Sequence, residues 1–495
     1  VVSIHNLMQL LHFLLLVSSA ASYKIFCLHT IPSKSHFHLV NGIVQPLLKA
    51  GHQVQHTHAY FSKFKWNIDM ADPKVTFEDV NILARNLSVS TTRMPAIREV
   101  MVKEQFEAIV TEWFFTNIDF GYAAIQRVPW IVLSGNVLHA EVEQMVDAVR
   151  SVPIIPSVHS DFHVPMTFLE RLKIIIITSF FYFYMMTFTK TKSDYEENFG
   201  PLATARGVPL PPFEDVHKNV SILLSNSHPS FAPARSIPPN VIEIGGYHID
   251  ANIPELPKDL KDILDASTHG VIYFSMGSVL KSTALKKNTR RELLQVFGNL
   301  KQTVLWKFDE DIDNLPKNVH IRPWMPQSGI LAHPNVKVFI SHGGLLSTLE
   351  ALYYGVPMLA IPVFADQPHN TARSVEGGYA VKVKYSQKMA PDVKAGLEEM
   401  LTNDSYFNTA KEMSKLFKNR LNKPTELITH NIELAIESKG APHLRSVIKK
   451  YKWYEYLMMD QLLLTTVIIY LTYIAIKKLI SDTMQDIMKS SKKWD

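Results

Sequence analysis

Nine residues between positions 319 and 370 combine an aromatic ring, glycines, a histidine and carboxylates in a fixed order. They are Trp324, Gln327, His342, Gly343, Gly344, Ser347, Glu350, Asp366 and Gln367. A tryptophan face can stack on a base, glycines at a helix start let an anion approach backbone N–H groups, and carboxylates accept hydrogen bonds from ribose and sugar hydroxyls. Each residue alone would more often be a turn, a core residue or a solvated helix face. The ordered set predicts a nucleotide-sugar site.

The elements expected around this set are two strands joined by a helix. Val336–Ser341 and Pro357–Phe364 are continuous apolar runs, which are typical of the doubly buried strands of a parallel sheet. In such sheets ligands bind outside the carboxyl ends of the strands, where His342–Gly344 falls at the start of the helix. Ser347 and Glu350 are three residues apart and therefore share one helix face.

A second sheet is expected at the start of the chain. Tyr23–Leu28 is typical of a strand, His29–His38 of the loop that leaves its carboxyl end, and Leu39–Lys49 of a helix. No G-x-G-x-x-G follows this strand, which disfavours a dinucleotide and with it a Rossmann-type oxidoreductase. The fold class predicted is α/β, with two Rossmann-like domains.

The ordered set W-x-x-Q, H-x-G-x-x-S-x-x-E and D-Q resembles the donor-binding signature of the UDP-glycosyltransferase family, in its membrane-bound animal form and above all in its insect members. The resemblance implies two domains facing across a cleft, the arrangement called GT-B. Plant members carry Asn before the matching serine, whereas this chain has Leu346, which is the usual animal departure.

The resemblance also assigns roles within the donor site. It implies that Trp324 stacks on uracil beside Gln327 and that His342 contacts the diphosphate. It further implies that Glu350 holds the ribose, and that the sugar is held by Asp366 and Gln367. A strand at Gly270–Met276 ends at Gly277-Ser278, and the family uses the position of Ser278 near the phosphates.

The catalytic base implied by the resemblance is a histidine in the first loop, within a Ser-His-aromatic context. Ser35-His36-Phe37 matches that context, so His36 is the predicted base, with His38 as the rival. Such a base needs a carboxylate to fix its tautomer and stabilise the imidazolium. Glu112, after a strand at Phe106–Thr111, is the predicted partner, and Asp119 is the alternative.

No metal or other cofactor is expected, because a helix start and His342 can serve the phosphates. The acidic run Asp309–Asp313 contains a D-x-D pattern, but it is interpreted as a solvent-exposed loop and not as a metal-binding motif. The net charge of +5 over 495 residues gives no reason to expect a nucleic-acid partner. A homo- or hetero-oligomer stays open.

Two segments indicate a membrane. Leu7–Val17 is apolar and followed by small residues, which is typical of a secretory signal peptide whose start is incomplete. Leu457–Ile476 is long enough for a single span. The resulting expectation is a type I protein of the endoplasmic reticulum, with lumenal catalytic domains and a K-K-x-x retrieval end. N-glycosylation sequons at Asn86, Asn219 and Asn403 agree with a lumenal location. The single cysteine, Cys27, would by itself suggest a reducing compartment, but the membrane and sequon signals outweigh it.

The predicted domain organisation follows from these segments. It comprises a signal peptide (1–22), an acceptor-binding Rossmann-like domain (23–247), a UDP-sugar-binding Rossmann-like domain (248–440), a juxtamembrane segment (441–456), a transmembrane helix (457–476) and a cytosolic tail (477–495). The linker between the two domains is expected at Val241–Gly246 and the Pro-rich Ile253–Lys258. The apolar stretch Lys173–Lys190 is expected to be a helix that is buried or lies against the bilayer, and to form much of the acceptor pocket together with loops around Met94–Met101.

The predicted function is inverting transfer of a hexosyl group from a UDP-sugar to a hydroxyl of small lipophilic acceptors, in detoxification or in hormone or pigment conjugation. UDP-glucose is the favoured donor, and UDP-glucuronate is the alternative. A hypothesis of another class is a membrane-anchored carrier of lipophilic ligands that keeps the fold without turnover.

Overall fold

The structure is a computed structural model, which describes residues 22–58, 77–146, 160–187, 190–250, 253, 255–277 and 285–491. The chain divides into two compact units, Val1–Arg445 and Ser446–Asp495. The expected signal peptide, apart from its last residue, lies outside the described residues, as do Ser278 and the K-K-x-x end.

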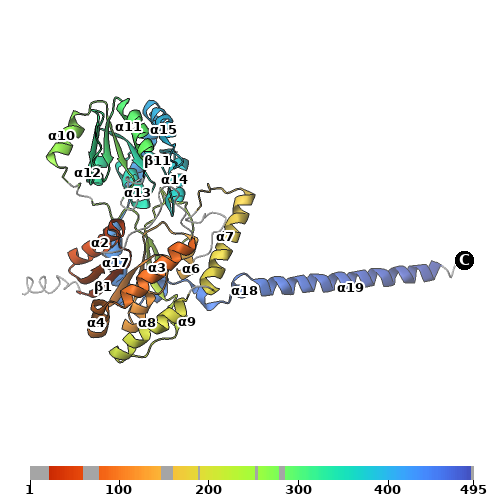
Figure 1. The fold of residues 1–495 in the computed structure, drawn as a ribbon. Coiled ribbons are helices and arrows are strands. Elements are labelled where there is room, and N and C mark those ends of the chain that lie inside the picture. Colours follow the sequence, from red (N-terminus) through yellow and green to blue (C-terminus); the bar gives the residue numbers. More distant parts are fainter. Residues whose placement is uncertain are drawn as a thin grey trace, which may run out of the picture. The chain divides into compact units, whose positions relative to one another are not determined.

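A parallel sheet organises the first part of unit one (Figure 1). Among the described residues its strands, in spatial order, are β2 (Gln53–His58), β1 (Lys24–His29), β3 (Ala108–Trp113), β4 (Trp130–Ser134), β5 (Val220–Ser225) and β6 (Val241–Glu243). Every neighbouring pair is parallel, so the carboxyl ends of the strands lie along one edge. The strands β1, β3, β4 and β5 are almost wholly buried, as continuous apolar runs predict.

Helices cover both faces of this sheet. They are α2 (Lys34–Lys49), α3 (Phe77–Thr92), α4 (Pro95–Lys103), α5 (Phe120–Gln126), α6 (Ala140–Val146), α7 (Phe168–Thr187), α8 (Thr191–Arg206) and α9 (Phe213–Val216). One core contains Phe26, Phe120 and Phe199 together with Ile97 and Met101 of α4. The expectation that residues around Met94–Met101 form pocket loops is therefore wrong, because the apolar face of α4 is buried in this core.

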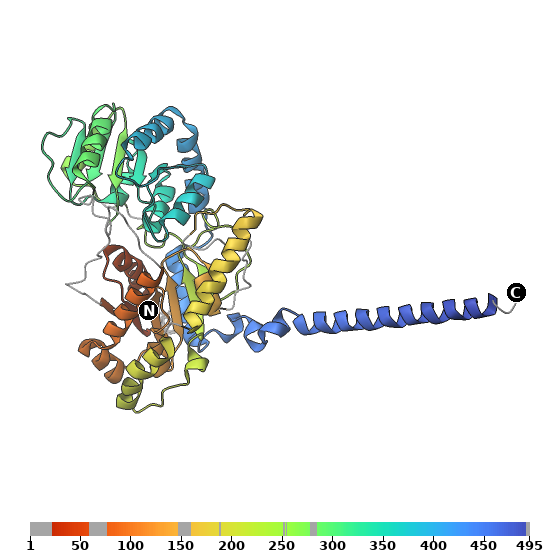
Figure 2. The ribbon, with the colours of Figure 1, turned by 45° about the vertical axis from the view of Figure 1, so that its right-hand side comes forward.

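A second parallel sheet follows in the chain (Figure 2). Its described strands, in spatial order, are β12 (Ala380–Lys382), β11 (Met358–Ala360), β10 (Val336–Ser341), β7 (Val271–Ser275), β8 (Thr303–Lys307) and β9 (Val319–Arg322). The helices that go with it are α10 (Lys258–Ala266), α11 (Lys287–Gly298), α12 (Gln327–Ala332), α13 (Leu345–Tyr354), α14 (Gln367–Glu376), α15 (Ala390–Thr402) and α16 (Ser405–Lys418). The strand–helix–strand unit expected around His342 is confirmed as β10, α13 and β11.

The last helix of unit one, α17 (Pro424–Glu437), returns to the first sheet. Ile428, Ile432 and Ala435 lie in the same core as residues of β1, β3 and α2. His52, before β2, hydrogen-bonds Glu433 of α17 at 3.0 Å. The range 248–440, assigned from the sequence to the second domain, thus includes one helix that completes the first.

Three boundaries differ from those expected. Helix α2 begins at Lys34, so His36 lies in its first turn and not in a loop, because the hydroxyl of Ser33 accepts a hydrogen bond from the His36 N–H at 3.3 Å and caps the helix. Strand β3 continues through Glu112, which pairs with Leu133 of β4. The first half of Val241–Gly246, expected to be linker, is strand β6.

The second unit begins with a short 3-10 helix, Val447–Lys450, followed by α18 (Trp453–Tyr456) and the long helix α19 (Met459–Ser491). Met459–Lys489 of α19 is long and apolar enough to cross a membrane. Most of the span expected at Leu457–Ile476 lies inside this helix, which continues beyond it to Ser491.

Candidate functional site

A cleft of about 2050 Å³ lies at the carboxyl ends of both sheets. Part of its lining comes from residues that follow or end strands: Glu112 and Gly135 of the first sheet, and Gly277, Lys307 and His342 of the second. This is the place where parallel α/β sheets bind ligands. The cleft therefore collects the residues that the sequence singled out from opposite ends of the chain.

His36 and Glu112 form a pair on the first side of the cleft. The distance between His36 Nδ1 and Glu112 Oε1 is 2.5 Å. The His36 ring stands edge-on to Phe114, at 5.3 Å between ring centroids. Gly135 leaves room for the pair, because a Cβ at that position would lie 3.3 Å from the carboxylate and 2.6 Å from a methyl group of Leu39. The carboxylate thus fixes one ring nitrogen of His36 and leaves the other for chemistry.

The pKa of His36 is raised above its ordinary value of 6.5. Burial by itself lowers this pKa, but the charge of Glu112 and its hydrogen bond outweigh the burial, and Asp366 adds a smaller effect. The side chain of Glu112 is almost completely buried, whereas that of His36 keeps contact with solvent. A histidine in this state takes up a proton readily and can pass it on to water.

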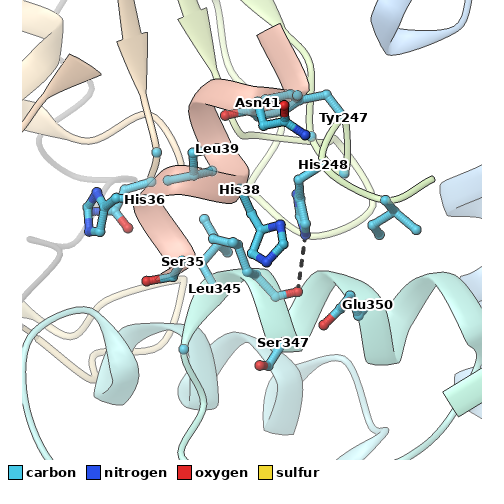
Figure 3. Close-up of a pocket in the computed structure, with 18 of the residues that line it drawn as sticks. Ser35, His36, His38, Leu39, Asn41, Tyr247, His248, Leu345, Ser347 and Glu350 are labelled. Atoms are coloured by element: carbon cyan, nitrogen blue, oxygen red, sulfur yellow. Dashed lines mark hydrogen bonds between the residues drawn. The ribbon is translucent and has the colours of Figure 1, made fainter. Parts of the chain in front are cut away.

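His38 points another way. Two residues along a helix lie about 200° apart around its axis, so His38 cannot share the direction of His36 (Figure 3). It lies near His248, whose Nε2 is 3.4 Å from the backbone carbonyl of Leu346. Burial lowers the pKa of His38, and Lys34 lowers it further. The structure thus pairs His36, and not its rival, with the carboxylate, while Asp119 accepts a hydrogen bond from Ser88 at 3.1 Å.

The predicted diphosphate seat is built from two glycine turns around His342. Gly277 and Gly343 both have φ of +78°, a conformation that favours glycine. A Cβ on Gly277 would lie 2.6 Å from the His342 ring, and one on Gly344 would lie 2.5 Å from it. Gly344 caps α13, whose first N–H groups face the cleft. The ring is thus held against the backbone that an anion would approach.

The charge of this seat comes from lysine, not from His342. Burial lowers the pKa of His342 to about 4, so the ring is neutral near pH 7 and serves as a hydrogen-bonding group. Lys307, the last residue of β8, donates a hydrogen bond to the carbonyl of Gly277 at 2.5 Å. Its ammonium also lies 5.2 Å from the Trp324 ring centroid. Lys34 of α2 reaches the same ring at 4.3 Å.

Trp324 is half exposed in the cleft, after β9. The Lys34 ammonium lies over the ring, so a base that stacks on the same face would displace it. Cation–π contact and base stacking use the same π surface. The ring, placed where the resemblance puts uracil, therefore already attracts cations.

Glu350 is the centre of a hydrogen-bond network. Gln327 donates from its amide to one carboxylate oxygen, and the Ser328 hydroxyl donates to the other. The Gln327 amide also donates to the Ser347 hydroxyl at 3.0 Å. Burial raises the pKa of Glu350, although both hydrogen bonds oppose the shift. Each oxygen keeps a second acceptor site, so the carboxylate can still receive two hydroxyls.

Asp366 and Gln367 lie at the start of α14, close to the first turn of α13. The Asp366 carboxylate accepts from the Asn370 amide at 2.7 Å, and the N–H of Leu345 also bonds to it. Burial raises its pKa, while these hydrogen bonds and the charge of His36 lower it. The side-chain oxygen of Gln367, Oε1, accepts hydrogen bonds from the backbone N–H groups of Val363 and Phe364, at 2.8 and 3.1 Å. Within the described part of the chain the side-chain amide nitrogen of Gln367 has no hydrogen-bond partner, and Gln367 lines the cleft, so this nitrogen can serve a ligand.

The family model described as UDP-glucoronosyl and UDP-glucosyl transferase matches residues 97–494. The chain belongs to the UDP-glycosyltransferase family.

Relatives of both named activities lie in this family. UDP-glucosyltransferase 2 of Dactylopius coccus is 28% identical over 482 residues, which is 92% of either chain. The human UDP-glucuronosyltransferase 2B7 is 32% identical over 310 residues, covering 62% of this chain and 56% of its own length. A solved UDP-glucosyltransferase of Polygonum tinctorium superposes with a TM-score of 0.56 and 15% identity, over 85% of this chain and all of its own. That last likeness confirms the GT-B fold.

Part of the cleft wall on the side of the first sheet is apolar. Ile177 and Phe180 of α7 line it together with Val80, Phe114 and Phe115. Two residues of the apolar stretch after Lys173 thus line the cleft.

Four residues of the site escaped the sequence reasoning: Lys34, Lys307, His248 and Ser328. Of these four, only Lys307 could have been found from the sequence, because it is the last residue of a strand and ligands bind at the carboxyl ends of parallel strands. The others depend on contacts between elements far apart in the chain.

Proposed function

We propose that the protein transfers a hexosyl group, with inversion, from a UDP-sugar to a hydroxyl of a small lipophilic acceptor. The observation that carries this proposal is the His36–Glu112 pair, which lies in the same cleft as the proposed donor residues. Asp366 is near enough for its charge to raise the pKa of His36. In this proposal His36 is the base, Glu112 its orienting partner, and the residues from Trp324 to Gln367 hold the donor.

The reaction follows from these positions. The free ring nitrogen of His36 takes the proton of the acceptor hydroxyl, and the oxygen forms its bond to the anomeric carbon as the bond to the UDP oxygen breaks on the opposite side. Glu112 stabilises the imidazolium that results. The charge on the departing diphosphate is met by the Lys307 ammonium and by hydrogen bonds from His342 and the start of α13.

UDP-glucose is the donor we favour. The support is twofold: the insect glucosyltransferase matches along almost the whole chain, and the sugar end of the cleft presents the carboxylate of Asp366, which suits neutral hydroxyls. UDP-glucuronate is the second candidate, because relatives such as the human glucuronosyltransferase carry that name. Acceptors would be lipophilic alcohols or phenols, in keeping with the apolar side formed by α7.

A donor panel tests the function directly. The full chain is mixed with a fluorescent phenol and with UDP-glucose or UDP-glucuronate, and UDP release is measured. We expect turnover with UDP-glucose and little with UDP-glucuronate. A membrane-anchored carrier would bind the phenol and release no UDP with either donor, which would overturn the proposal.

The placement in the cell is also a proposal. We place both sheets in the lumen of the endoplasmic reticulum, with α19 as the single span. The asparagines of the three sequons, Asn86, Asn219 and Asn403, are exposed, which would leave them open to glycosylation there. We further propose the domain roles given above: the first sheet for the acceptor, the second for the donor.

Replacing Glu350 by Gln should weaken donor binding by about tenfold or more, because a charge-assisted hydrogen bond contributes roughly 1.5–3 kcal/mol and ~1.4 kcal/mol is tenfold. UDP and the intact UDP-sugar should lose affinity equally, since the lost contact is to ribose. Calorimetric titration of both ligands measures this. Ser328→Ala is the matched control, because it removes a neighbour of the carboxylate and keeps its charge.

Asp366→Asn should give the opposite pattern and weaken the UDP-sugar while sparing UDP. The reason is that Asp366 lies near enough to His36, the proposed base, for the two charges to interact, and this is where the transferred sugar is proposed to lie. The same titrations apply. Equal losses for the two ligands would mean that the sugar is held elsewhere.

Chelation by EDTA should leave transfer largely intact, because Lys307 and the start of α13 can carry the phosphate charge. Activity is measured before and after dialysis against the chelator. A complete loss that magnesium restores would bring back Asp309–Asp313 as a ligand set.

A further inference from the structure

Lys34 of helix α2 contacts an aromatic ring that belongs to the other sheet. Its ammonium lies 4.3 Å from the ring centroid of Trp324, which follows β9, and the Lys307 ammonium lies 5.2 Å from the same centroid. Both lysines and the tryptophan line the cleft. Two cations therefore share one indole ring, and one of them comes from the helix that carries His36.

The charge of Lys34 is not balanced by its surroundings. Lys34 is the first residue of α2, and the first turn of this helix contains no acidic residue. A cation at a helix N-terminus is unfavourable, because the helix dipole already places positive charge there. Lys34 forms no ion pair with any carboxylate in the described part of the chain. Such a departure from local rules is most often found at functional sites.

Neighbouring groups respond to this positive charge. Burial lowers the pKa of Lys307, the charge of Asp309 opposes the shift, and the charge of Lys34 lowers the pKa further. Burial also lowers the pKa of His38, and the charge of Lys34 adds to that shift. The two lysines therefore repel each other, and an anion bound between them would relieve this repulsion.

The distance from the ring to the diphosphate seat is short. Lys307 contacts the Trp324 ring and donates a hydrogen bond to the carbonyl of Gly277 at 2.5 Å. The turn at Gly277 packs against the ring of His342, which belongs to the seat. One ammonium thus already spans the distance between the ring and the seat. A rotation of the Lys34 side chain is enough to bring a second ammonium to the same anion.

We propose that Lys34 is an additional donor-binding residue, which moves from the Trp324 ring to the diphosphate when a UDP-sugar enters the cleft. A base that stacks on the covered face of the ring takes the place of the ammonium, because cation and base use the same π surface. The ammonium of a lysine sits on a flexible four-carbon stem, so it can turn toward the charge that arrives with the base. This inference rests on the proposed function, because its ligand is a UDP-sugar.

The same contact ties donor binding to the position of the base. Lys34 and His36 both lie in the first turn of α2, which the Ser33 hydroxyl caps. A diphosphate held by Lys34 fixes this turn against the second sheet, and the imidazole is fixed with it. Holding the reacting groups in place in this way lowers the entropic part of the barrier to transfer.

Calorimetric titrations of the full chain with UDP and with uridine test the proposal. In Lys34→Met we expect the affinity for UDP to fall by about tenfold or more, which corresponds to ~1.4 kcal/mol, because the diphosphate loses one ammonium. The affinity for uridine should rise by about two- to fivefold, because no cation–π contact has to be broken before the base stacks. Lys34→Arg should keep most of the affinity for UDP. Lys49→Met, at the other end of α2, is the matched control that removes the same charge.

The two ligands separate the possible failures. Parallel losses for UDP and uridine in Lys34→Met would overturn the proposal and indicate a structural role of the side chain. An unchanged affinity for UDP in this variant would overturn it as well, while the proposed function would stand if the unaltered protein binds UDP and transfers the sugar. Absence of UDP binding by the unaltered protein would overturn both.

Labelling of amines in the unaltered protein gives a second measurement that needs no variant. An acylating reagent is added to the empty protein, to the protein with UDP and to the protein with uridine, and the modification of each lysine is quantified by mass spectrometry. We expect UDP to slow the labelling of Lys34 and uridine to speed it, whereas Lys49 should be labelled equally in all three samples. Equal labelling of Lys34 in all three would overturn the proposal.

Discussion

Replacing His36 by Ala should lower kcat by roughly 10²–10⁴-fold, the contribution of a positioned general base. The affinity for the UDP-sugar should hardly change, because the donor residues belong to the other sheet. Steady-state kinetics and calorimetric titration with the UDP-sugar measure the two effects separately.

His38→Ala is the matched control for this variant. It removes a histidine two residues away that faces α13 and not Glu112. We expect it to keep most of the activity. If His38→Ala lost the activity while His36→Ala kept it, the assignment of the base would be wrong.

Glu112→Gln should also cause a large loss, of up to about 10⁴-fold, as when the carboxylate of a catalytic triad becomes an amide. The amide keeps the size of the side chain but no longer stabilises the imidazolium. Asp119→Asn is the control, because Asp119 is buried beside Ser88 and does not reach His36. An equal loss in both variants would indicate a structural effect of buried charge and not an orienting role.

The pH profile of the same variant gives a readout that a purely structural role would not move. A general base works in its neutral form, and the pKa of His36 in the intact pair is raised above 6.5, so kcat/KM should rise with pH through a midpoint above that value. In Glu112→Gln burial still lowers the pKa, while the opposing charge is gone. The midpoint should therefore shift to lower pH. An unchanged midpoint would mean that His36 is not the titrating group.

Much of the fold follows from the sequence because buried parallel strands are continuous apolar runs. Val336–Ser341 is such a run, and its boundaries agree with β10. The first turn of α2 was missed because the apolar periodicity of that helix starts only at Leu39. The cap by Ser33, a short polar signal before it, sets the true start.

The sequence could predict the site residues that lie at or just after strand ends, but not the contacts that other residues make with them. His36, Glu112 and Asp366 come together because parallel sheets gather their carboxyl ends. The pairing of His36 with Glu112 is itself a prediction from the sequence, and the structure places His36 Nδ1 2.5 Å from Glu112 Oε1. Contacts such as Lys34 over Trp324, or Ser328 on Glu350, depend on how separate helices and loops pack. No spacing along the chain encodes them.

Because α17 covers one face of the first sheet, the core on that face stays incomplete until Glu437 has been translated. The second sheet, from β7 to β12, is translated in full before that point. Domains commonly fold in the order in which they are synthesised. In the first sheet, the core on one face consists of residues between Phe26 and Val241 and can form early, whereas the core on the other face waits for Ile428 and Ile432, which are translated after the whole second sheet. A nascent chain stalled before Pro424 would therefore expose β1 and α2 to chaperones.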